Sequence, residues 1–246
     1  KIERTGPEVL RSRLVRVNFS LLKPPPAVEV GSSLVLNLFP NLQLIVKLED
    51  FERTKYGYAW IGSVQGMEHS RVILVVVNGV LSGSVRIPKS FFLIEYAGEG
   101  LHGVYEINEC AVPGDPLNTP VPDDSPTPSA VTLLQVVSRD DASRIDVMVV
   151  YTPAARAGAG GTSQIRALID QMILQTNDAF SNSQVNTRLR LVYTAEVNYT
   201  ESGDLSLDLE RLQTDGDGYL DDVHPLRDTY GADLVSLIVE QGDSAG

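Results

Sequence analysis

The sequence predicts an α+β protein with a β-rich N-terminal unit, residues 1–112, and an α/β unit, residues 143–246. Three observations predict this division. Short apolar runs with a period of two fill the first unit, as in half-buried strands. Six prolines interrupt residues 113–130, where neither a helix nor a sheet ladder forms readily. From residue 143 onward, strand-like runs alternate with segments of helical period, which is the order typical of a parallel sheet covered by helices.

The N-terminal unit is expected to be a meander, a curled sheet or a sandwich of short strands. The dipeptide Asn78-Gly79 separates two of its apolar runs and predicts a two-residue hairpin, because both turn positions need a positive φ. The Pro-rich composition predicts that residues 113–142 form an extended, solvated linker. We expect strands at residues 14–19, 33–39, 42–48, 71–77, 80–87, 91–96 and 102–107.

The second unit is expected to have the order β-α-β-α-β. A near-continuous apolar run at 144–152 predicts a strand buried on both faces. The glycines of 158–161 predict a flexible connector, and a helix capped by Thr162 or Ser163 follows, with its apolar residues spaced along one face. Pro225 predicts a kink or a late start in a helix at 219–230. The remaining elements are strands at 189–197 and 232–240 and a helix at 205–212.

Composition excludes several classes of protein. Residues 1–112 carry 12 basic and 11 acidic side chains, a net charge of +1, whereas residues 113–246 carry 8 basic and 21 acidic ones, a net charge of −13. An acidic unit is a poor partner for phosphate backbones, so nucleic-acid binding is not expected. No apolar run reaches the length of a membrane span. The single cysteine, Cys110, excludes an internal disulfide.

Residues that could carry chemistry are sparse. The three histidines, His69, His102 and His224, form no metal-binding motif and none neighbours the cysteine in sequence. The acidic run 215–222 fails the EF-hand spacing, because its fifth and sixth positions are tyrosine and leucine. It is better explained as a Gly-rich turn with Asp217 capping the next helix, while a calcium site of another kind stays an open alternative.

One segment nevertheless resembles a known family. The run Ile145-Asp-Val-Met-Val-Val-Tyr-Thr-Pro-Ala-Ala-Arg156 resembles the start of the catalytic domain in bacterial reprolysin-like zinc metalloendopeptidases, a group of metzincins. The resemblance continues through Gln175–Ser183, Leu189–Val192 and Asp217–Ile238, and covers about residues 143–246. Residues 10–112 resemble, more loosely, the β-rich pro-segment that precedes such domains.

The resemblance implies a secreted zinc peptidase that acts on proteins or peptides. In that family, three histidines of a His-Glu-x-x-His-x-x-Gly-x-x-His helix bind zinc, and the glutamate is the general base for the attacking water. The motif is absent from these 246 residues. We therefore expect further sequence at both ends, an inactive and zinc-free chain, and a pro-domain that packs on its own catalytic domain. Arg139 and Arg144 are candidate activation sites.

Cys110 has two interpretations. It is an ordinary thiol at the end of a strand, or, as the resemblance implies, a pro-segment cysteine whose thiolate blocks the catalytic zinc. Two other functions also stay open for the chain: a secreted binding or adhesion module without catalysis, and an inhibitor or folding helper for a separate protease.

Overall fold

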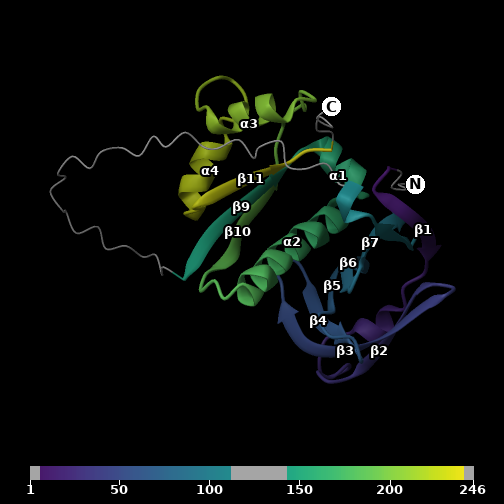
Figure 1. Cartoon of the computed structure of the whole chain (residues 1–246). Helices are drawn as coiled ribbons and strands as arrows, with labels where there is room; N and C mark the ends of the chain where they lie inside the picture. Colours follow the sequence, from purple (N-terminus) through teal and green to yellow (C-terminus); the bar gives the residue numbers. More distant parts are fainter. Residues whose placement is uncertain (1–5, 112–142, 241–246) are drawn as a thin grey trace.

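The computed structural model describes residues 6–111 and 143–240, which form two sheets with a long helix between them (Figure 1). The predicted linker, residues 113–142, lies outside the described residues. From one side of the molecule to the other, the layers are two short helices, a three-stranded parallel sheet, the long helix α2 and a curled eight-stranded sheet. The expected α+β class is therefore confirmed.

The N-terminal sheet is antiparallel throughout and runs in the order β1-β8-β7-β6-β5-β4-β3-β2. The predicted hairpin is confirmed between β5 and β6, where Asn78 has a φ of 49° and Gly79 a φ of 79°. The strands are β1 Val9–Val15, β2 Ser33–Phe39, β3 Leu42–Arg53, β4 Tyr58–Val64, β5 Arg71–Val77, β6 Val80–Ile87, β7 Ser90–Gly98 and β8 Leu101–Ile107.

Two features of this sheet differ from the sequence prediction. Strand β4 was not expected, because both of its faces are buried and no alternation marks it: Trp60 points into the curled sheet, whereas Ile61 packs against α2. The strand expected at 14–19 ends at Val15. The side chain of Asn18 accepts a hydrogen bond from the Ser20 N–H and caps a short 3₁₀ helix, η1 (Phe19–Leu22).

The second sheet has β9 (Arg144–Tyr151) at its centre, with β10 (Arg188–Glu196) and β11 (Leu234–Ile238) parallel to it on either side. The expected parallel pairing is confirmed. The helices α3 (Leu205–Gln213) and α4 (Val223–Tyr230) lie on one face of this sheet, and α2 (Thr162–Asn182) lies on the other (Figure 1). Helix α4 begins late, as Pro225 predicted.

The prediction of a flexible connector at 158–161 was wrong in part. Residues Pro153–Ala159 form a helix, α1, whose N-cap Thr152 accepts a hydrogen bond from the Ala155 N–H at 2.9 Å. Pro153 does not prevent this helix from forming, since proline is compatible with the first helical position. Gly160 ends α1 with a left-handed φ of 98°.

Candidate functional site: the interface on helix α2

Helix α2 has two apolar faces rather than the single one that its sequence predicted. Ile165 and Ile169 are buried against β9, within the core of the second unit. Ala167 and Leu174 are buried in a separate cluster with Ile73 and other residues of β4 and β5, so the N-terminal sheet and α2 share a core. Met172, expected on the apolar face, is 43% exposed.

A polar row on α2 faces the N-terminal sheet beside that cluster. The Gln171 side chain accepts a hydrogen bond from the Ser82 hydroxyl, and the Gln175 amide donates to the Ser84 hydroxyl at 2.8 Å. One turn further along, Asp178 forms an ion pair with Arg71. Buried polar groups without partners are costly, so these contacts fix how the sheet lies across the helix.

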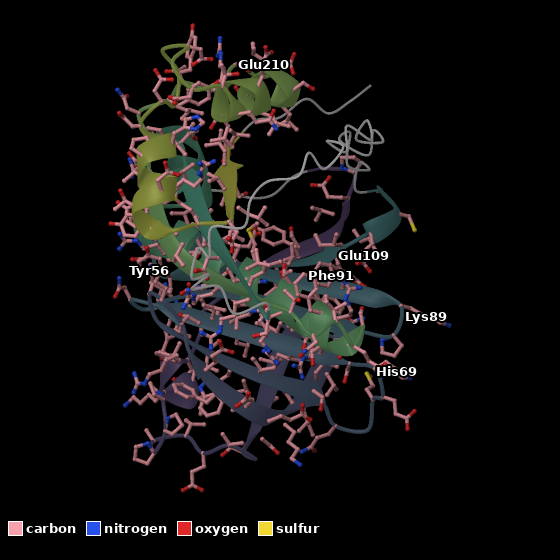
Figure 2. The ribbon with its side chains drawn as sticks, turned by 90° about the vertical axis from the view of Figure 1, so that its left-hand side faces the viewer. Tyr56, His69, Lys89, Phe91, Glu109 and Glu210 are labelled. Atoms are coloured by element: carbon pink, nitrogen blue, oxygen red, sulfur yellow. The ribbon has the colours of Figure 1, made fainter. Side chains whose placement is uncertain are left out.

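The turn between β3 and β4 contacts two elements of the second unit. The Tyr56 N–H donates to the Asp170 carboxylate at 3.2 Å, and the Tyr56 hydroxyl forms a hydrogen bond with the Thr194 hydroxyl. The Arg166 guanidinium lies 4.5 Å from the centroid of the Tyr56 ring, in a cation–π contact. Figure 2 shows Tyr56 on the side of the molecule where the N-terminal strands meet α2. Tyr56 therefore contacts both α2 and β10.

Two carboxylates at this interface have a raised pKa: Asp170, which is buried, and Glu52, which stays largely exposed. Burial raises the pKa of Asp170, although hydrogen bonds from Thr54 and the Tyr56 and Lys55 backbone oppose the shift. Burial and the charge of Asp50 raise the pKa of Glu52, which lines an adjacent cavity of about 460 Å³ between the two units. The charged form of both groups is therefore less favourable here than in water.

Cys110 lies on the opposite part of the N-terminal sheet, in a short 3₁₀ helix, η2 (Glu109–Ala111), that follows β8. The thiol is exposed and its backbone N–H donates to the Asn108 side chain at 3.2 Å. The neighbouring Glu109 receives two hydrogen bonds from Arg86, at 2.9 and 2.8 Å, and lies near Phe91 in Figure 2. The structure brings no other candidate site residue to this cysteine among the residues it describes.

The described residues do not fit a catalytic zinc ion. In residues 6–111 and 143–240, no three His, Cys, Asp or Glu side chains converge where a metal ion could bind. His102 is fully buried and its Nε2 accepts a hydrogen bond from the Leu81 N–H at 3.0 Å, a structural role in the core. Burial lowers the pKa of His102 to about 4.

The acidic loop 215–222 turns its carboxylates toward its own backbone. Asp221 accepts hydrogen bonds from the N–H groups of Gly216 and Gly218, at 2.8 and 3.1 Å. Asp217 accepts one from the Tyr219 N–H, so the expected cap of the next helix by Asp217 was wrong: α4 begins later, at Val223. The loop is explained as a turn stabilised by its aspartates.

Comparison with known proteins shows what the second unit is similar to. Residues 142–246 match the model of a family described as metallo-peptidase family M12B, reprolysin-like. Helix α2 and the three-stranded sheet therefore lie within the segment that is similar to this family, as the sequence resemblance indicated, and the family is zinc-dependent in general.

Relatives extend the similarity beyond that segment. A peptidyl-Asp metalloendopeptidase of Xanthomonas campestris pv. campestris is 29% identical over 177 residues, and one of Stenotrophomonas maltophilia strain K279a is 30% identical over 182 residues. Each alignment covers 71% of this chain and 42% of the relative. A third, from Pseudomonas aeruginosa, is 40% identical over 95 residues, which cover 38% of this chain and 15% of that relative.

The lengths of these alignments show which parts of the chain are similar to the relatives. The first two alignments are much longer than the reprolysin-like segment, so they extend well into the N-terminal unit. The chain spans about 42% of the length of these relatives.

No sequence pattern predicted the role of Tyr56, which depends on a turn meeting residues more than a hundred positions away. The polar residues of the second face of α2 gave no signal of the interface either. Gln164, Gln171, Gln175 and Asp178 fall on one side of a helix at spacings of seven, four and three residues. In a sequence, such a polar row indicates a face in contact with water, so only the structure shows that the N-terminal sheet covers it.

Proposed function

We propose that the complete protein is a secreted zinc metalloendopeptidase and that residues 1–112 are its pro-segment, packed on the N-terminal part of the catalytic domain. The observation that carries the proposal is the shared core of the N-terminal sheet and α2, a helix of the reprolysin-like segment. The name of the relatives, peptidyl-Asp metalloendopeptidase, suggests substrates that contain aspartate.

The contacts on α2 support a pro-segment that acts on its own chain. The N-terminal sheet covers Leu174 and supplies partners for Asp170 and Gln171, each of which is 5% exposed or less. Removal of the sheet would expose the apolar cluster and leave these polar groups to water. A surface of this kind favours the sheet of the same chain as its partner, because an intramolecular contact forms at a high effective concentration. A separate protease would have to displace that contact before it could bind the sheet.

The zinc ligands would come from the His-Glu-x-x-His-x-x-Gly-x-x-His motif of the family, which these 246 residues do not contain. Chain 1–246 is therefore expected to be inactive alone. Cys110 stays a hypothesis for latency: its thiol is exposed and reaches solvent, as a thiolate that blocks a metal on another segment would require. None of the described helices has the length and apolar character needed to cross a membrane.

The test is an activity assay on the product of the complete open reading frame. We expect cleavage of an aspartate-containing peptide, slower cleavage of the matched asparagine peptide, and loss of both with a zinc chelator. The Cys110→Ser variant should show activity before any processing if the thiol maintains latency. Unchanged latency in that variant removes the role of Cys110 but leaves the peptidase proposal standing.

The two alternative functions predict different results. A binding or adhesion module would show no chelator-sensitive cleavage by the complete protein. An inhibitor of a separate protease would make chain 1–246, added in trans, inhibit a mature relative at stoichiometric concentration. A complete protein that neither cleaves peptides nor contains the zinc motif would overturn the peptidase proposal.

A further inference from the structure

The curled N-terminal sheet leaves a gap between its two edge strands. Strand β1 pairs only with β8 and strand β2 only with β3, so neither edge has a partner across the gap within the described residues. The edges meet at one end, where Arg11 donates a hydrogen bond to the Asn41 side chain at 2.9 Å and lies 3.9 Å from the centroid of the Phe39 ring. The opening is therefore a wedge, closed at this end.

A cavity of about 450 Å³ occupies this wedge. Its floor is formed by core residues of the inner strands, including Leu74, Leu81 and Val104, which are at most 3% exposed. Val15, Val17 and Leu36 pack against the same core yet stay partly exposed, because nothing closes the sheet over them. The volume is within the range of sites that bind small molecules, about 300–1,000 Å³.

The rim of this cavity is basic. Its polar lining residues are Arg13, Arg16, Asn18 and Asn37, and no acidic side chain lines it. The two asparagine side chains are engaged, with Ser20 and Gln43. In the part of the chain that the structure describes, no ion pair or hydrogen bond is formed by the side chain of Arg13 or Arg16. The Arg16 guanidinium lies beside Gly100, in the turn between β7 and β8, so Arg13 carries the unpaired guanidinium group at the mouth of the apolar cavity.

We propose that this wedge, independently of any peptidase activity, is a binding site for a small amphipathic anion of the medium-chain fatty acid class. The alkyl chain would lie on Leu36 and the core residues beneath it, and the carboxylate would accept hydrogen bonds from Arg13, a pairing that guanidinium geometry favours. A linear ligand fits the site better than an added peptide strand, because the edges converge at Arg11 and leave no full-length slot.

The experiment is calorimetric titration of chain 1–246 with hexanoate, octanoate and decanoate below their micellar concentrations. Each added methylene should tighten binding about fourfold until the cavity is full. Arg13→Gln should weaken decanoate binding about tenfold and leave the binding of neutral decanol unchanged. Lys89→Gln is the matched control, since it removes one exposed positive charge from the turn between β6 and β7 of the same sheet.

Leu36→Trp should fill the cavity and abolish binding, with circular dichroism as the check on folding. The variant Arg13→Gln keeps the test decisive if that substitution prevents folding, because Arg13 lies on the rim and not in the core. Absence of saturable decanoate binding would overturn the proposal. So would an affinity that is independent of chain length, or an equal loss of affinity in Arg13→Gln and Lys89→Gln.

Discussion

Replacing Leu174 by alanine tests whether the two units share a core. Leu174 is 5% exposed and lies in the cluster formed by α2 with strands β4 and β5. Truncation removes about three methylene equivalents at about 0.8 kcal/mol each and adds the cost of the cavity left behind. We expect a loss of about 3 kcal/mol in the free energy of unfolding, or roughly 6–12 °C in Tm for a chain of this size.

The assay is urea unfolding of chain 1–246 followed by tryptophan fluorescence and by far-ultraviolet circular dichroism. Trp60 reports on the N-terminal sheet, since it is fully buried within it. The matched control is Met172→Ala on the same helix, where 43% exposure predicts a loss below about 1 kcal/mol. The shared core would be refuted if Leu174→Ala lowered the free energy of unfolding no more than Met172→Ala does. An unchanged fluorescence transition in Leu174→Ala would refute it as well.

Four further predictions concern single contacts. Thr152→Ala should cost about 1 kcal/mol in thermal unfolding by removing the cap of α1, whereas Thr152→Ser should restore most of it. The pKa of buried His102 is lowered to about 4. The free energy of unfolding should therefore be greatest above pH 6.5 and fall by about 3 kcal/mol as the pH decreases to 4. His102→Gln should flatten this pH dependence in urea titrations. A double-mutant cycle of Tyr56→Phe and Thr194→Val should give a coupling of about 0.5–1.5 kcal/mol, and independent, additive losses would contradict the hydrogen bond. Asp170→Asn should remove the stabilisation that the wild type gains as the pH falls toward 4, measured as the difference between the two urea profiles.

Local sequence patterns predicted most of the strands, because the bounds of these strands depend on short apolar runs and on the residues of single turns. Strands β2, β5 and β6 begin and end where the apolar runs do, and the Asn78-Gly79 turn needs only its own two residues. Strand β4 was missed because α2 covers its outer face, and burial on both sides removes the alternation that marks a strand. Helix α1 was missed because its glycines suggested a connector, although Thr152 and Pro153 form a helix start.

Local sequence patterns did not predict the interface on α2, for a different reason. The spacing of Ile165 and Ile169 indicates an apolar face, and β9 does bury it. Nothing in that spacing says that Ala167 and Leu174 are covered by strands that lie about a hundred residues earlier in the chain. Likewise, the family resemblance could assign residues 143–246 but could not locate a metal site whose motif these residues do not contain.

The titrating groups of the two units respond to acid in opposite directions. Burial raises the pKa of Asp170, so the packed interface binds its proton more readily than the separated unit does. Acid therefore relieves the cost of burying this carboxylate, although protonation weakens the hydrogen bond that it accepts from the Tyr56 N–H. Burial lowers the pKa of His102, so the same acid destabilises the N-terminal sheet from within. A moderate fall in pH therefore destabilises the sheet through His102 while it relieves the burial cost of Asp170 at the interface. If the N-terminal unit is a pro-segment, acid favours its release by unfolding the sheet around His102 and not by titrating Asp170.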